Sequence, residues 1–212
     1  MKIIVYIFYT FAIKMDNSKS IKIILLGESG VGKTSLINAA TEKGFDQEIK
    51  SSFSSSYTEN IIECNNKKLI YRLWDIAGQE RYRSLNKLFI KDSKILMFVF
   101  AINSQNSFDQ INFWINYAKE ILSDEKYIMA LIANKSDLFE EQIISNKDIK
   151  DKANEYKIKS LITSANSDAE GFKKFLNELI KDYIELIGPE KEKELYFQLN
   201  GEKTNKKRKK CC

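Results

Sequence analysis

The sequence predicts an α/β domain with a six-stranded, mostly parallel sheet and helices on both faces. Apolar, strand-like runs alternate with helix-like segments from Ile21 onward, which is the order that a doubly wound sheet requires. A glycine-rich stretch joins the first apolar run to the first helical pattern. The Asn65-Asn66 pair separates two strand-like runs and predicts one antiparallel hairpin. The 212 residues are enough for one domain with a complete core.

The pattern of apolar residues places each expected element along the chain. We expect strands over residues 21–26, 57–64, 68–74, 95–101, 127–133 and 159–163. We expect helices over about 35–43, 107–122, 146–156 and 169–187. Gly188-Pro189 ends the last helix, and the charged, apolar-poor residues after it predict a flexible tail. The domain is therefore expected over residues 19–188 and the tail over 189–212.

An apolar run over residues 3–13 precedes the domain. It is too short to span a bilayer as a helix. A charged start and a short apolar core are also typical of a secretory signal, but Lys14-Met15-Asp16 follows instead of a small-residue cleavage site. We expect residues 1–18 to form an extension outside the domain, with Met15 opening the working protein.

Charge, histidine and cysteine usage exclude several functions. Residues from Glu202 onward carry six Lys/Arg and one Glu, which accounts for the whole net charge of +5, so no nucleic-acid-binding face is expected on the domain. The chain has no His, which excludes His bases and His-ligated zinc. Cys64 is isolated, and the adjacent Cys211 and Cys212 suit neither a disulfide framework nor a zinc site. A reducing compartment is expected.

The central motif is Gly27-Glu28-Ser29-Gly30-Val31-Gly32-Lys33-Thr34, which fits the phosphate loop G-x-x-x-x-G-K-[ST] at every fixed position. Its glycines let successive backbone N–H groups point into one concavity, and the following helix adds its positive N-terminus. Lys33 can reach the β- and γ-phosphates, and the Thr34 hydroxyl is the expected Mg²⁺ ligand. The motif predicts a nucleoside triphosphate and does not identify the base.

A second motif, Trp74 to Glu80, lies where the third expected strand ends. An acidic residue at the position of Asp75 can hold Mg²⁺ through its water shell. Gly78 would let the backbone approach the γ-phosphate, and Gln79 can orient an attacking water.

A third motif, Asn134-Lys135-Ser136-Asp137, follows the fifth expected strand at its carboxyl end, where open α/β sheets bind ligands. A carboxylate there can accept hydrogen bonds from the ring N–H and the exocyclic amine of guanine. Adenine offers an acceptor at that ring position and leaves a polar group unpaired. A further stretch, Thr163-Ser164-Ala165-Asn166, closes the last expected strand, and the main-chain N–H of its Ala165 could donate to guanine O6. The third motif therefore favours guanine and disfavours an ATP-using P-loop enzyme.

Taken in this order, the motifs resemble those of a Ras-superfamily small GTPase, specifically of the Rab family. Residues 79–85 match the family's second switch, residues 103–108 with Trp114 match its third-helix region, and the terminal Cys-Cys is a third match. The resemblance covers residues 21–187 and the end of the tail. It implies a P-loop small-GTPase fold, and a slow GTPase that uses Mg²⁺ and alternates between GTP and GDP to regulate vesicle-mediated transport.

The resemblance also implies residue roles. Nucleotide contacts are expected from Glu28, Ser29, Gly30, Val31, Gly32, Lys33, Thr34, Ser35, Phe45, Ser52, Gly78, Asn134, Lys135, Asp137, Ser164, Ala165 and Asn166. Metal ligands are expected at Thr34, Ser52 and Asp75, and the catalytic roles at Gln79 and Lys33.

Several positions depart from the family pattern. Ser52 stands where the first switch carries a Thr, and Phe53-Ser54-Ser55-Ser56-Tyr57 replaces Ile-Gly-x-x-Phe. Asn166 replaces a Lys near the base. No essential group is removed, but the altered first switch leaves open an alternative, a GTP-binding scaffold that hardly hydrolyses GTP.

The polybasic run Lys206 to Lys210 followed by Cys211-Cys212 resembles a dual geranylgeranylation site. Two lipids with a polybasic stretch anchor a protein stably, whereas one lipid binds reversibly. The resemblance implies prenylation escort machinery, an exchange factor, a GTPase-activating protein and effectors as partners. It places the protein on the cytoplasmic face of an endomembrane, cycling with the cytosol.

Overall fold

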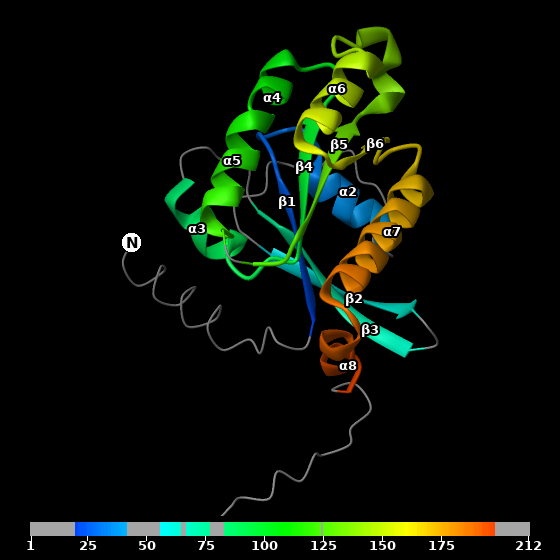
Figure 1. The fold of residues 1–212 in the computed structure, drawn as a ribbon. Helices are drawn as coiled ribbons and strands as arrows, with labels where there is room; N and C mark the ends of the chain where they lie inside the picture. The colour runs from blue at the N-terminus through cyan, green and yellow to red at the C-terminus, as the bar shows by residue number, and fades with distance from the viewer. Residues whose placement is uncertain (1–19, 42–55, 65–66, 77–82, 124, 198–212) are drawn as a thin grey trace, which may run out of the picture.

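The computed structural model describes residues 20–41, 56–64, 67–76, 83–123 and 125–197 (Figure 1). The strands are β1 (Ile21–Leu26), β2 (Ser56–Cys64), β3 (Lys67–Asp75), β4 (Ile95–Ala101), β5 (Ile128–Asn134) and β6 (Lys159–Ile162). The helices are α2 (Lys33–Ala40), α3 (Arg83–Ile90), α4 (Gln105–Asp109), α5 (Ile111–Ile121), the 3₁₀ helix η3 (Ser136–Glu141), α6 (Asn146–Tyr156), α7 (Ala169–Ile187) and α8 (Pro189–Phe197).

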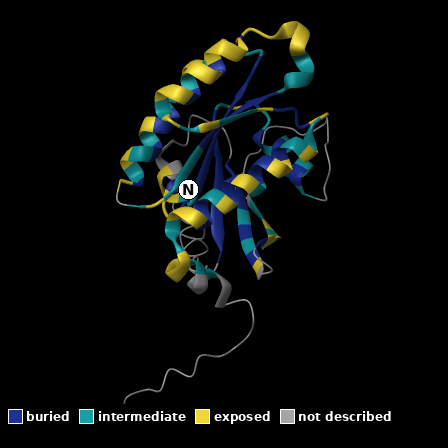
Figure 2. Cartoon of the chain, turned by 45° about the vertical axis from the view of Figure 1, so that its right-hand side comes forward, coloured by how far each residue is buried: buried dark blue, intermediate teal, exposed yellow. Residues whose placement is uncertain are grey.

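The centre of the sheet is fully buried. Every residue of β1 and of β4 is buried, and Figure 2 shows these central strands in dark blue behind helices that alternate between buried and exposed positions. Strands covered on both faces read as nearly continuous apolar runs, and in β1 Lys22 is the one exception, so the sequence predicts both strands correctly. The predicted bounds of β1 and β4 are confirmed.

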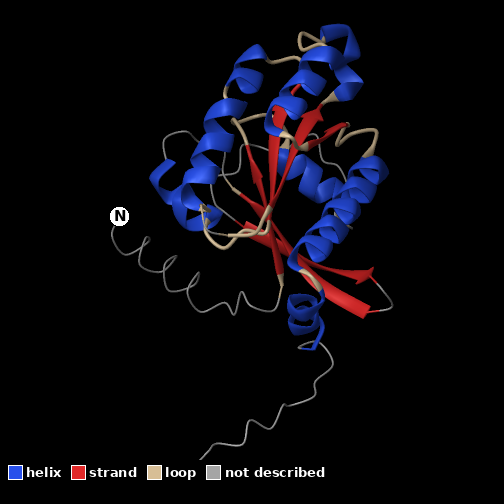
Figure 3. Ribbon diagram, viewed as in Figure 1, coloured by secondary structure: helices blue, strands red, loops and turns tan. Residues whose placement is uncertain are grey.

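The six strands form one sheet in the order β2-β3-β1-β4-β5-β6. Among the strands that the structure describes, β2 and β3 alone pair antiparallel, with Cys64 opposite Lys67, and the other pairs are parallel. Figure 3 shows the strands as a single twisted layer between helices. The predicted six-stranded, mostly parallel sheet with helices on both faces is confirmed.

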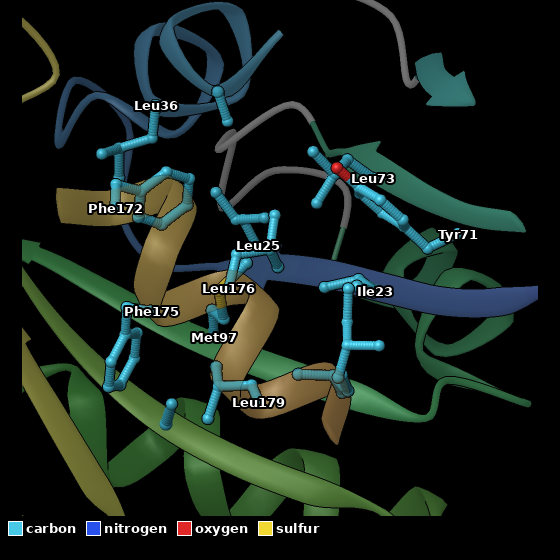
Figure 4. Close-up of a cluster of buried hydrophobic side chains, with 14 of the residues drawn as sticks. Ile23, Leu25, Leu36, Tyr71, Leu73, Met97, Phe172, Phe175, Leu176 and Leu179 are labelled. Atoms are coloured by element: carbon cyan, nitrogen blue, oxygen red, sulfur yellow. The ribbon is translucent and has the colours of Figure 1, made fainter. Parts of the chain in front are cut away.

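Each face of the sheet has its own apolar core. Ile23 and Leu25 of β1 face α2 and α7, whose Leu36, Phe172 and Leu176 complete one core (Figure 4). The alternate β1 residues, Ile24 and Leu26, face the other core, which residues of α3, α5 and α6 cover and against which Phe108 of α4 packs. The alternation follows from the two-residue repeat of a strand.

Several helices differ from the sequence-based expectation. The helix predicted over 107–122 is two helices that meet at Gln110, and it begins earlier because the Ser104 side chain accepts from the N–H of Ser107. α2 ends at Ala40, where Thr41 is extended. The helix α3 and the 3₁₀ helix η3 were not predicted, whereas α6 and α7 have their predicted bounds.

The expectation of a flexible tail from residue 189 is wrong for residues 189–197, which form α8. Pro189 occupies the first position of the helix, where its fixed φ and missing N–H cost nothing. Glu190 and Glu192 lie in the first turn, where their negative charges interact favourably with the positive end of the helix dipole. Leu195 packs against the core on the α7 side, and α8 contacts β3. The signal that ends α7 also starts the next helix.

Other expectations lie outside the described residues. These are the extension over residues 1–18, the tail with Cys211 and Cys212, and the predicted site residues Phe45, Ser52, Gly78 and Gln79.

Candidate nucleotide-binding site

The predicted site residues gather at one edge of the sheet, at the carboxyl ends of its parallel strands. The residues after Leu26 of β1 form the phosphate loop, and Asp75 and Asn134 are the last residues of β3 and β5. This is the edge at which open α/β sheets bind ligands.

The phosphate loop turns into α2 at Gly32, which has a φ of 94°. A side chain is strained at this φ, and a Cβ there would lie 2.3 Å from Nδ2 of Asn134. Position 32 therefore accepts only glycine, both for its conformation and for the close approach of the loop to β5.

Lys33 is the first residue of α2, and only 6% of it is exposed. Its Nζ donates to the carbonyls of Gly27 and Glu28 at 2.8 and 2.7 Å. Burial lowers the pKa of Lys33 from 10.5 to about 8, although the carboxylates of Asp75 and Glu28 oppose that shift. The ammonium is thus held inside the loop at a position suited to phosphate oxygens.

Two predicted metal ligands contact each other directly. The hydroxyl of Thr34 donates to Oδ2 of Asp75 at 2.6 Å, and Asp75 is 5% exposed. A hydroxyl with a carboxylate is a hard-oxygen donor set that fits Mg²⁺, which usually takes few protein ligands beside waters and phosphates. The described residues contain no cluster of three or more His, Cys, Asp or Glu that would suit another metal site.

The side chain of Asn134 connects the phosphate loop with the loop that follows β6. Its Nδ2 donates to the carbonyl of Val31 at 2.8 Å, and its Oδ1 accepts from the N–H of Ala165 at 3.1 Å. Asn134 is 1% exposed. The amide therefore holds two segments that are far apart in the sequence.

The carboxylate of Asp137 is held by the same loop after β6. The hydroxyl of Ser164 donates to its Oδ1, and Nδ2 of Asn166 lies 3.4 Å from its Oδ2. Lys135 precedes it with a φ of 68°, a left-handed conformation that turns the chain from β5 into η3. The turn brings Asp137 back over the strand ends.

A pocket of about 280 Å³ lies between these loops. The residues that line it are Gly30, Gly32, Ser35, Asn134, Lys135, Asp137, Leu138, Ser164, Ala165 and Asn166. All of them except Leu138 were predicted as nucleotide contacts. Leu138 was missed because an apolar residue inside a polar loop carries no motif signal.

The sheet order and the glycine-rich loop define the P-loop class of α/β domains. The model of the Ras family matches residues 22–185. The Ras-related protein Rab-21 of Geodia cydonium is 32% identical over 79% of this chain and 72% of its own. GTP-binding protein ypt3 of Schizosaccharomyces pombe is 31% identical over 76% of each chain. The human Ras-related protein Rab-8B is 34% identical over 70% of this chain and 71% of its own.

The chain belongs to the Ras family, within its Rab group of small GTPases. The resemblance drawn from the sequence motifs is therefore confirmed. Within the described residues, none of the helices combines the length and the apolar character needed to cross a bilayer.

Proposed function

We propose that this chain is a membrane-anchored switch that binds GTP or GDP and regulates vesicle-mediated intracellular transport. The observation that supports this most directly is the position of Asn134, because its amide joins the phosphate loop to the loop beside Asp137. One pocket can then hold phosphates at one end and read guanine at the other.

The proposed reaction is attack of water on the γ-phosphorus, which gives GDP and inorganic phosphate. Lys33 would stabilise the charge that develops on the phosphate oxygens, and Gln79 would orient the water. Thr34, Asp75 and Ser52 would hold Mg²⁺, which supplies further positive charge when bound. Because the sequence offers no identifiable arginine finger, we expect slow turnover that a GTPase-activating protein accelerates.

The proposed switch consists of the segment near Ser52 and residues 79–85. Contacts with the γ-phosphate would order both segments, and hydrolysis would release them, so that effectors read the GTP-bound form. An exchange factor would then restore GTP.

The decisive experiment measures nucleotide content and single-turnover GTP hydrolysis of the purified full-length protein. We expect co-purified guanine nucleotide, no bound adenine nucleotide, and slow hydrolysis that a Rab GTPase-activating protein increases. The matched control is the Gln79→Leu variant, which should bind GTP like the parent but not respond to the activator. Absence of guanine nucleotide, or equal binding of ADP, would contradict the proposal.

The altered first switch supports a second candidate, a GTP-binding scaffold that hardly hydrolyses GTP. Ser52 retains a hydroxyl for Mg²⁺, yet Phe53, Ser54 and Tyr57 replace the Ile, Gly and Phe of the family pattern. The hydrolysis assay with and without the activator separates the GTPase switch from the scaffold. Tight GTP binding without activator-dependent hydrolysis would favour the scaffold, and a Ser52→Thr variant that regains hydrolysis would identify the cause.

The anchor is proposed from the polybasic run before Cys211 and Cys212, which prenylation escort machinery would present for dual lipidation. We expect the full chain to fractionate with an intracellular endomembrane, on its cytoplasmic side, and partly with the cytosol. A Cys211→Ser, Cys212→Ser double variant should be entirely cytosolic with unchanged GDP affinity. Membrane association that persists in this variant would contradict lipid anchoring at these cysteines.

A further inference from the structure

Trp114 lies on the buried face of α5 and is fixed there by the core. It is 3% exposed and belongs to the same apolar cluster as Ile111 and Ile115 of its own helix. The ring of Phe113 meets its ring edge-on, with the centroids 5.3 Å apart. The indole therefore has little freedom to move.

The polar atom of this indole points to the phosphate loop. Nε1 of Trp114 donates to Oε1 of Glu28 at 3.1 Å, between residues 86 positions apart. An indole N–H can only donate, and a carboxylate makes a stronger acceptor than a neutral group. The contact therefore fixes the Glu28 side chain to a rigid helix.

The main chain of Glu28 holds the lysine of the phosphate loop. Its carbonyl accepts from Nζ of Lys33 at 2.7 Å, the shorter of the two hydrogen bonds that the ammonium makes to the loop. The Glu28 carboxylate also counteracts part of the pKa decrease that burial causes at Lys33. One residue thus links the indole on one side with the ammonium on the other.

We propose that Trp114 is a positioning residue for nucleotide binding. Its indole fixes the side chain of Glu28, and the main chain of Glu28 in turn fixes the Lys33 ammonium where it meets the β-phosphate. This inference rests on the proposed function, because it requires a guanine nucleotide in the pocket. It extends the site to α5, a helix that does not line the pocket.

The test compares GDP with GMP, since GMP lacks the β-phosphate that Lys33 would contact. The affinity of the full-length protein for each is measured by competition with a fluorescent GDP. Trp114→Phe keeps an aromatic ring but removes the donor, and a lost hydrogen bond to a charged group should weaken GDP binding about tenfold. The affinity for GMP should stay within about twofold of that of the parent, because GMP makes no contact with Lys33 through a β-phosphate and mutations at sites without a shared contact rarely affect each other by more than this factor.

A matched control separates positioning from a general loss of stability. Ile115→Val removes one methylene from the same buried face of α5 without touching Glu28. It should lower the free energy of unfolding and leave GDP affinity unchanged. A Glu28→Ala, Trp114→Phe double variant should lose no more GDP affinity than the weaker-binding of the two single variants.

Each other outcome is informative. Equal losses for GDP and GMP in Trp114→Phe, unchanged GDP affinity, or additive losses in the double variant would overturn the inference while leaving the proposed function intact. A parent protein that binds no guanine nucleotide would instead overturn the proposed function. If Trp114→Phe does not fold, the inference is tested with Glu28→Gln instead. This side chain keeps an acceptor oxygen for the indole, so the variant should lose less GDP affinity than Glu28→Ala. Equal losses in the two variants would overturn the inference.

Discussion

The side-chain amide of Asn134 donates a 2.8 Å hydrogen bond to the main-chain carbonyl of Val31, a residue 103 positions earlier. The other atom of the amide accepts from the N–H of Ala165. Since Asn134 is almost completely buried, water cannot replace either partner. The phosphate loop and the base-side loop are therefore held together by a single side chain.

Replacing Asn134 with Ala should loosen both loops at once. Two buried main-chain groups would lose their partner, which costs about 1–3 kcal/mol for each group left unsatisfied. We expect faster release of GDP, by roughly 30-fold or more, since 1.4 kcal/mol corresponds to about a factor of ten. Stopped-flow displacement of fluorescent GDP would measure this.

The control for Asn134→Ala is Asn112→Ala on α5. The Asn112 side chain also has two partners, Nζ of Lys152 and the hydroxyl of Tyr156, but both lie on α6, away from the pocket. This variant should lower stability without changing GDP release. If both variants released GDP equally fast, the connection through Asn134 would not be what holds the nucleotide.

How well the sequence predicts this fold depends on what each segment buries. β4 reads as an unbroken apolar run, β1 as an apolar run interrupted by Lys22 alone, and α7 as one apolar stripe, so their bounds are visible in the sequence. The sequence of α8 is mostly charged, and its Leu195 packs against the core. Pro189 is a local signal for the start of this helix, but the packing of α8 against the core and β3 is a tertiary contribution that local patterns do not contain.

The residues of the candidate site also fall into two groups, those that local sequence motifs predict and those that only the fold brings together. The phosphate-loop and base-side residues were predictable because their chemistry requires fixed residue types at fixed spacings. The hydrogen bond from Trp114 to Glu28 was not, because it joins two elements through the fold and has no local signal. Leu138 was missed for the same reason, since only the left-handed turn at Lys135 brings it to the pocket.

Gly32→Ala should abolish tight nucleotide binding and destabilise the protein. The new Cβ would lie 2.3 Å from Nδ2 of Asn134, in addition to the strain of a φ of 94°. Gly188→Ala is the matched control, because Gly188 has a φ of 80° and a Cβ there would meet no atom of the described residues within 4 Å. With a ψ of 170° this backbone lies in a region that is essentially restricted to glycine, so the variant should cost only that strain, about 1–3 kcal/mol. Urea unfolding of both variants gives the comparison, and equal costs would mean that the clash with Asn134 is relieved.

Stability should rise with pH between about 8 and 9, because two lysines lose their protons more easily in the folded protein. Above about pH 9 the buried Tyr71 and Tyr183 oppose this trend, because burial raises the pKa of their hydroxyls and the folded protein keeps those protons longer. Burial lowers the pKa values of Lys22 and Lys33 from 10.5 to about 8. Between about pH 8 and 9 the unfolded chain binds more protons, so raising the pH favours the folded state by up to about 1.4 kcal/mol per pH unit for each lysine. Urea unfolding at several pH values measures the slope.

The variant that tests this explanation is Lys22→Met. Lys22 is 5% exposed, lies over the ring of Trp74 and donates to the carbonyl of Lys91, so Met can fill most of its space. The slope should fall to about half, since one of the two lysines remains. Lys147→Met, at an exposed position on α6, should keep the full slope. A slope that Lys22→Met leaves unchanged would exclude Lys22 as its source.

Asp137→Asn should exchange guanine for xanthine as the preferred base. The carboxylate accepts from both the ring N–H and the exocyclic amine of guanine, but the amide has only one acceptor oxygen. Its NH₂ group can instead donate to the carbonyl that xanthine carries in place of that amine. The Oδ1 that accepts from the Ser164 hydroxyl is retained, so this hydrogen bond to the loop beside the base is kept, and the weak contact of the exposed Asn166 amide with Oδ2 is lost. Two mismatched polar contacts should weaken the affinity for GDP by about 100-fold or more.

Competition between GDP and its xanthine analogue measures the change. The control is Asp148→Asn in the exposed capping box of α6, which should leave the preference for guanine intact. An unchanged preference in Asp137→Asn would mean that another group reads the base.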